Sequence, residues 1–206
     1  MKLVDSNLYQ ERNLHEKKLM KLHIFFLLCV CLHANLLFSS VTVIGREGAA
    51  LCYQEAEMGN SGYSSINTCL KALQDQFLTT QDRSGTQVNL GIVLNNSFLP
   101  DRALRAFSKA KISEELKPEI LLNSGNSYFI KTEFWKAIEY YDKSIKSGLK
   151  DRSAAFYNKG LSYEMLKDMN SAIVNYKKAL LLKPDKVYFK KKENLLRAAI
   201  GPNNFL

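Results

Sequence analysis

Histidine is absent from most of the chain, since His15, His23 and His33 all lie within the first 33 of its 206 residues. The remainder therefore has no imidazole to act as a general base, as the partner of a nucleophile or as a metal ligand. A glycine-rich phosphate loop and paired metal ligands are also missing. These absences argue against an enzyme, and we expect no cofactor and no metal.

Arginine-rich segments with interleaved aromatic residues, which are typical of nucleic-acid-binding proteins, do not occur either. The formal net charge is +9, from 29 basic and 20 acidic side chains. Such a balance favours anionic partners such as acidic peptides, phosphates or a membrane surface. Lysine is equally a common solvated residue of helix surfaces. We therefore expect a protein partner and no nucleic acid.

The first 45 residues have the composition of a targeting segment. Residues 22–44 are mostly apolar, follow Lys17, Lys18 and Lys21, and carry no charge before Arg46. A charged front, an apolar middle and small residues near the end are typical of an export signal, which would have 26 residues if it starts at Met20. Two alternatives stay open: an uncleaved membrane anchor and a buried globular helix.

One sequence pattern occurs twice between Pro118 and Lys186, with a constant offset of 35 residues. A repeat of this length predicts a short supersecondary unit that stacks on its neighbours because it cannot bury its apolar face alone. Function is then expected on a surface. The aligned pairs are Gly125 with Gly160, Tyr128 with Tyr163, Ala137 with Ala172, and Tyr141 with Tyr176.

Helical periodicity of the apolar residues predicts an all-α fold, and no useful length of sequence alternates with the period of a strand. Turn residues separate the helices into pairs. The expected helices are 49–58 with 63–77, 87–96 with 102–113, 118–130 with 135–147, 154–166 with 170–182, and a last helix at 187–199.

The last repeat closely resembles the tetratricopeptide repeat, in Asn158-Lys-Gly-Leu-Ser-Tyr163, Ser171-Ala-Ile-Val-Asn-Tyr-Lys-Lys-Ala-Leu180 and Pro184. Gly125, Tyr128, Ala137 and Tyr141 match the same pattern, and Gly91, Ala103, Phe107 and Ala110 fit a third copy. The resemblance implies a right-handed superhelix of helical hairpins, or α-solenoid, with about three to four repeats and a C-terminal capping helix. Tyr53 and Ser65 replace the expected glycine and alanine, so the first hairpin is degenerate.

This resemblance also predicts the organisation of the chain. The repeat glycines and alanines are small where two helices cross closely, and the tyrosines fill the space between helices. The expected segments are a leader at 1–45 (polar extension 1–19, signal peptide or anchor 20–45), a degenerate hairpin at 46–83, repeats at 84–117, 118–152 and 153–186, and a cap with tail at 187–206. The expected packing residues are Gly91, Ala103, Gly125, Tyr128, Ala137, Tyr141, Gly160, Tyr163, Ala172, Tyr176 and Pro184.

Two cysteines, Cys52 and Cys69, lie outside the apolar leader. The repeat alignment places them on the two antiparallel helices of the first hairpin, facing one another. In an exported protein such a pair is expected to form a disulfide, which a resemblance to exported bacterial repeat proteins also favours. Two independent thiols are the alternative. Without histidine the pair is not expected to bind zinc.

The candidate binding surface follows from the family resemblance, because relatives hold extended peptides against the first helices of their hairpins, on a concave face. Asn89, Asn123 and Asn158 recur two residues before the glycine of each copy, and Asn126 follows the second glycine. A carboxamide offers a donor and an acceptor, so a ladder of them can bind a peptide main chain of any sequence. Asparagine for helix packing is the alternative. The expected apolar floor is Leu122, Phe129, Ile130, Tyr157, Leu161 and Met165, with Lys191 and Lys192 at its C-terminal end.

The sequence thus predicts an exported, periplasmic or extracytoplasmic scaffold or adaptor that binds a protein partner or extended peptide through this face. A membrane is involved only through residues 22–44 if the leader stays uncleaved. One rival is an envelope assembly factor anchored in the inner membrane. Another is a cytoplasmic protein whose leader packs against the repeats. Trp135 is expected at an exposed position, for packing on a neighbour or for partner contact.

Overall fold

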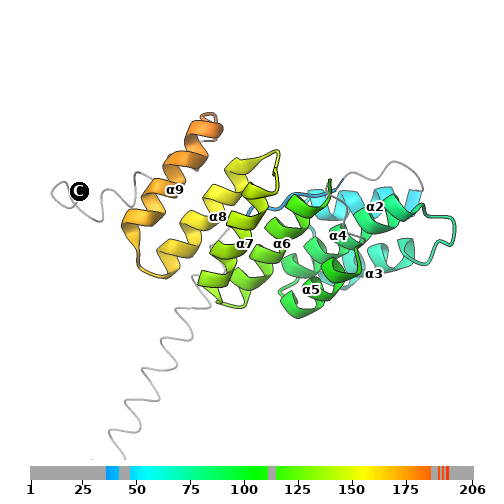
Figure 1. Ribbon diagram of the computed structural model, residues 1–206. Coiled ribbons are helices and arrows are strands. Elements are labelled where there is room, and N and C mark those ends of the chain that lie inside the picture. Colours follow the sequence, from blue (N-terminus) through cyan, green and yellow to red (C-terminus); the bar gives the residue numbers. More distant parts are fainter. Residues whose placement is uncertain are drawn as a thin grey trace, which may run out of the picture. The chain divides into compact units, whose positions relative to one another are not determined.

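The computed structural model describes residues 36–41, 47–110 and 115–186, together with positions 190, 192 and 194. Most of the predicted leader, and the predicted capping helix apart from those three positions, lie outside these residues. All regular structure in the described part is helical (Figure 1). Within it, no helix has both the length and the apolar character needed to cross a membrane.

The described helices follow one another in four hairpins, as the sequence predicts, and the all-α fold is confirmed (Figure 1). Each hairpin packs on the next, and the first helices of successive hairpins also contact one another. This arrangement is that of an α-solenoid. The pairs are α2 (Glu47–Glu57) with α3 (Gly62–Ala72), α4 (Thr80–Asn96) with α5 (Pro100–Lys109), α6 (Lys117–Ile130) with α7 (Phe134–Lys146), and α8 (Arg152–Met165) with α9 (Met169–Leu182).

Helix α4 begins seven residues before the start expected from periodicity, at Thr80 rather than at Gln87. Its first two turns are polar, so they carry no apolar stripe. Local hydrogen bonds define them instead: the Thr79 hydroxyl oxygen accepts from the Asp82 main-chain N–H at 3.0 Å, and the Thr86 hydroxyl donates to the Asp82 carbonyl at 2.7 Å. Thr79 is thus an N-cap, which satisfies an otherwise unpaired donor of the first turn.

The repeat glycines each lie under an aromatic ring from the second helix of the same hairpin. A Cβ atom added to Gly125 would lie 2.5 Å from Cε1 of Tyr141, and one on Gly160 or Gly91 would collide in the same way with Tyr176 or Phe107. The sequence explains these glycines by a close approach of the helices alone. The structure adds that the glycine makes room for a buried ring, which locks the two helices in register.

The repeat tyrosines differ in their burial. Tyr141 and Tyr176 are completely buried, as expected of core residues. Tyr128 and Tyr163, expected to be core residues as well, are only half-buried. Tyr128 packs on Tyr140 with ring centroids 4.8 Å apart, and Tyr163 packs edge-on against Trp135 at 6.1 Å. They therefore cover the outer edges of the hairpin contacts.

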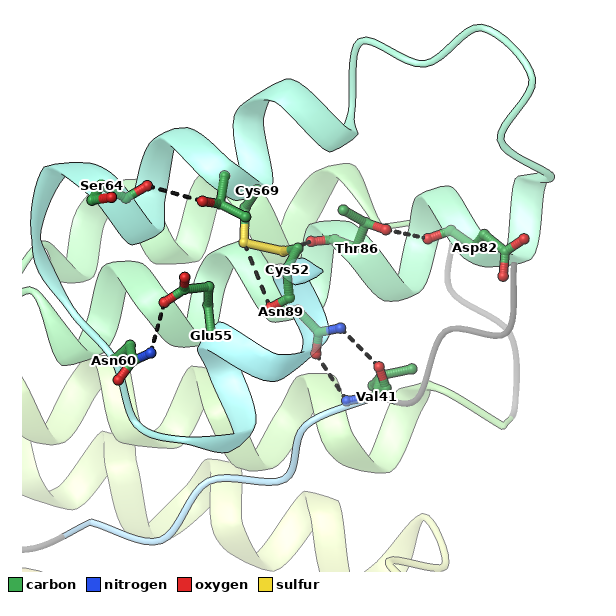
Figure 2. The surroundings of a disulfide bond; sticks show 10 residues. Val41, Cys52, Glu55, Asn60, Ser64, Cys69, Asp82, Thr86 and Asn89 are labelled. Carbon is green, nitrogen blue, oxygen red and sulfur yellow. Dashed lines mark hydrogen bonds between the residues drawn. A yellow bond between two sulfur atoms is a disulfide. The ribbon is translucent and has the colours of Figure 1, made fainter. Parts of the chain in front are cut away.

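The first hairpin joins Cys52 of α2 to Cys69 of α3 through a disulfide, with 4.6 Å between their Cα atoms (Figure 2). Both residues are fully buried and belong to the same apolar cluster as Ile66. The predicted facing arrangement of the two cysteines is thus present in the structure. That the pair is oxidised in the native protein stays a prediction.

Candidate functional site

An extended segment, residues 36–41, lies across the first helices of the last three hairpins (blue in Figure 1). It belongs to the same compact unit as the repeats. Alternate residues of the segment face the same side, as they do in any extended chain. The segment thus brings the main-chain groups of Leu37, Ser39 and Val41 to α8, α6 and α4 in that order.

Each of these three residues is paired with one asparagine through both of its main-chain groups. The Val41 N–H donates to Asn89 Oδ1 at 2.9 Å, and the Asn89 amide donates to the Val41 carbonyl at 2.7 Å (Figure 2). The Ser39 N–H donates to Asn123 Oδ1 at 3.4 Å, and the Asn123 amide donates back at 2.9 Å. The carboxamides thus act as the neighbouring strand of a β-sheet would.

The third pair completes the same pattern at α8. The Leu37 N–H donates to Asn158 Oδ1 at 3.0 Å, and the Asn158 amide donates to the Leu37 carbonyl at 2.8 Å. Asn89, Asn123 and Asn158, the three asparagines that recur in the repeats, therefore bind the segment two residues apart. We refer to these three and Asn126 as the ladder.

Asn126 of α6 binds the segment and also holds the neighbouring ladder residue Asn158. Its amide donates to the Leu37 carbonyl at 3.0 Å, while its Oδ1 accepts from the Asn158 amide at 2.8 Å and from the Tyr141 hydroxyl at 3.0 Å. Burial raises the pKa of Tyr141 well above its ordinary value, so this hydroxyl stays protonated and able to donate. The Tyr141 donor therefore fixes which end of the Asn126 carboxamide faces the segment.

All four ladder asparagines are completely buried once the segment is in place. A buried carboxamide without partners costs about 1 to 3 kcal/mol. The face on which they lie therefore needs an occupant that supplies main-chain donors and acceptors, or water in its place. This requirement separates the ladder from asparagines that serve helix packing alone.

The residues predicted as an apolar floor lie inside the hairpins instead of forming an open surface. Leu122, Phe129, Tyr157 and Leu161 are buried. The Phe129 ring packs on Phe134 at 5.3 Å and the Tyr157 ring on Tyr176 at 5.4 Å, within their own hairpins. Ile130 and Met165 are half-buried. Phe38 and Val41 of the segment pack against the core cluster of α2 to α6.

A hollow of about 600 Å³ adjoins the segment at Ser39, Ser40 and Val41, along the N-terminal ends of α4, α6 and α8. Four of its lining side chains are acidic and one is basic, and burial raises the pKa of one of the acidic ones, Glu119. This flank leaves room for side chains larger than serine. Its negative charge favours a cationic one.

The remaining predicted residues lie at the edges of this site. Trp135 is 65% exposed, as expected, while its ring also contacts the next hairpin through Tyr163. Lys192 binds Glu164 of α8, with Nζ 2.8 Å from Oε1. Lys191 lies outside the described residues.

Two features of the site were not foreseen from the sequence. Asn95 links α4 to α6 from below, because its amide donates to the Asn123 carbonyl at 3.1 Å and its Oδ1 accepts from Ser127 at 2.9 Å. The recurrence of asparagine in α4 could have indicated it. The 36–41 segment was assigned to the predicted leader; its position against the repeats agrees with the alternative of a packed leader, for these six residues.

Comparison with known families supports the resemblance seen in the sequence. The family model of the tetratricopeptide repeat matches residues 153–186, which comprise α8, α9 and the ladder residue Asn158. A comparison with curated proteins finds none that matches the chain.

Proposed function

We propose that the chain is an interaction scaffold of the tetratricopeptide repeat type, whose ladder binds an extended protein segment through its main chain. The match of residues 153–186 to that family model supports this. Repeats of this kind generally mediate protein–protein binding and are typically not enzymes. The observation that carries the proposal is the pairing of Asn89, Asn123 and Asn158 with both main-chain groups of alternate residues.

The ligand that fits this geometry is an extended segment of at least five residues. It must present an N–H group at every second position, so proline is excluded at the paired positions and tolerated between them. Its affinity should depend little on the identity of its side chains, because the six paired hydrogen bonds reach only main-chain atoms of the ligand. In the bound orientation it runs from α8 towards α4, opposite to the order of the repeats.

Replacing Asn123 and Asn158 together by alanine is expected to weaken peptide binding about 30-fold or more. The double variant removes four of the paired hydrogen bonds, each contributing about 0.5 to 1.5 kcal/mol. The measurement is the fluorescence anisotropy of a labelled peptide Leu-Leu-Phe-Ser-Ser-Val, the sequence of residues 36–41, titrated with the full chain up to millimolar concentration. All proteins compared here, the parent called wild type included, carry Ser39→Pro, so that residues 36–41 of the chain compete less with the labelled peptide.

The matched control replaces Asn96 and Asn170 by alanine, which removes two carboxamides that are not part of the ladder. This pair should bind the peptide as the wild type does. Circular dichroism of all three proteins checks that the fold is intact. Equal affinity of the wild type and the ladder variant would refute main-chain recognition by these asparagines.

We also propose that the chain is exported, with its leader removed, and that the repeats work outside the cytoplasm. Two observations support this location: the apolar leader behind Lys17, Lys18 and Lys21, and the facing pair Cys52 and Cys69. Mass spectrometry of the native protein should find a first residue near Arg46. A mass that retains residues 22–44 would favour the anchored assembly factor instead.

A further inference from the structure

We infer that residues 37–41 are a ligand in cis, which closes the ladder of the uncleaved chain to any peptide from outside. The inference rests on the proposed function, because it assigns to the segment the place of the partner. Its basis is that Leu37, Ser39 and Val41 each pair with one of the three recurring asparagines through both an N–H and a carbonyl.

The segment and an outside peptide exclude one another, because both need the same amide hydrogens and amide oxygens of the ladder. The two amide hydrogens of Asn158 go to the Leu37 carbonyl and to Asn126 Oδ1. The two acceptor sites of that Asn126 oxygen are taken by Asn158 and Tyr141. A carboxamide has two donors and two acceptor sites, so a second chain finds no free amide hydrogen on Asn158 and no free acceptor site on Asn126.

The covalent link makes the competition unequal. Only residues 42–46 separate Val41 from α2, which begins at Glu47. A short link of this kind gives a tethered ligand an effective concentration in the millimolar range. An outside peptide with the same main-chain contacts must therefore reach millimolar concentration before it displaces half of the segment. Phe38 and Val41 strengthen the tethered ligand further through their contacts with the core.

Cleavage of the chain between Val41 and α2 would remove this advantage. The segment would become a separate peptide, and its six hydrogen bonds would no longer profit from the tether. These same residues form part of the predicted leader. Removal of the leader is thus the step that opens the ladder, and the uncleaved chain is its closed form.

The test compares two proline variants of the full chain, Ser39→Pro and Ser40→Pro. Proline at 39 cannot supply the N–H that Asn123 accepts, whereas residue 40 is not one of the three paired residues. In both variants the residue before proline is held extended, which this segment already is. The labelled peptide Leu-Leu-Phe-Ser-Ser-Val is titrated with each protein and with the wild type.

Ser39→Pro is expected to bind the labelled peptide about tenfold more tightly than the wild type, while Ser40→Pro binds as the wild type does. The apparent dissociation constant scales with the inverse of the open fraction, so a tenfold change corresponds to a wild type that is about 90% closed. Equal binding by all three proteins would overturn the cis ligand and leave the proposed function intact. Failure of all three to bind would overturn both.

Amide hydrogen exchange of the wild type gives a second measurement that needs no outside ligand. Leu37, Ser39 and Val41 should exchange slowly and Phe38 and Ser40 quickly. The alternation should disappear in the Asn123→Ala and Asn158→Ala variant. Uniform exchange along residues 37–41 of the wild type would contradict the inference directly.

Discussion

Leucine in place of Gly160 is expected to lower the free energy of unfolding by about 3 kcal/mol, the upper end of typical overpacking effects. Gly160 lies directly under the Tyr176 ring, and even a Cβ atom there would be 2.9 Å from Cζ and closer to two other ring carbons. Tyr176 is completely buried, so its ring has no open space into which it can move. The change in the urea unfolding midpoint at constant m-value measures the effect.

Lys177→Leu is the matched control for this prediction, because it introduces the same side chain at an exposed position of α9. Surface substitutions of this kind usually change stability by no more than about 0.5 kcal/mol. A second comparison combines Gly160→Leu with Tyr176→Leu, which removes the ring and should recover part of the loss. If Gly160→Leu unfolds at the wild-type midpoint, the glycine does not make room for the ring.

Loss of the bond between Cys52 and Cys69 should cost about 3 kcal/mol, the value for a closed loop of roughly 15 residues in the chain-entropy model. The two residues are 17 positions apart. We expect the first hairpin to need this bond, because the repeat alignment places Tyr53 where the other hairpins have the glycine that lies under a ring. Thermal unfolding of the oxidised and reduced protein should differ by roughly 6 to 12 °C.

The experiment is cleanest when Cys29 and Cys31 are replaced by serine, so that Cys52 and Cys69 are the remaining cysteines. Native protein prepared without reductant should then show no reactive thiol after denaturation. Two reactive thiols per chain would show that the bond is absent. If reductant leaves the melting temperature unchanged, the bond contributes little to the stability of the fold.

The helices of the last hairpin were predicted to within two residues, because apolar periodicity, small residues at the helix crossing and Pro184 all indicate the same boundaries. Helix α4 was predicted less well, since its polar first turns are held by Thr79 and by hydroxyl groups that bond back to the helix. Hydrogen bonds of this kind leave no periodic trace. The fold was therefore predictable wherever packing alone determines it.

The ladder was predictable from the sequence, but the segment that occupies it was not. The carboxamides at equal spacing belong to side chains, whose identity the sequence specifies directly. Leu37, Ser39 and Val41 bind through main-chain groups, which every residue other than proline carries. Nothing in their identity distinguishes them from the rest of the apolar leader. The burial of Tyr128 was overestimated because alignment gives a position within the repeat and not its distance from the edge of a contact.

The distances along the chain between the partners of the ladder fix an order of assembly during synthesis. Asn89 follows Val41 by 48 residues in the sequence, Asn123 follows Ser39 by 84, and Asn158 follows Leu37 by 121. At translation rates of about 5 to 20 residues per second, synthesis of the chain from Leu37 to Asn158 takes on the order of ten seconds. The hydrogen bonds between the segment and the repeats can therefore form first at Val41 and last at Leu37. The partner of Leu37 becomes available only when almost all of the repeats have been synthesised.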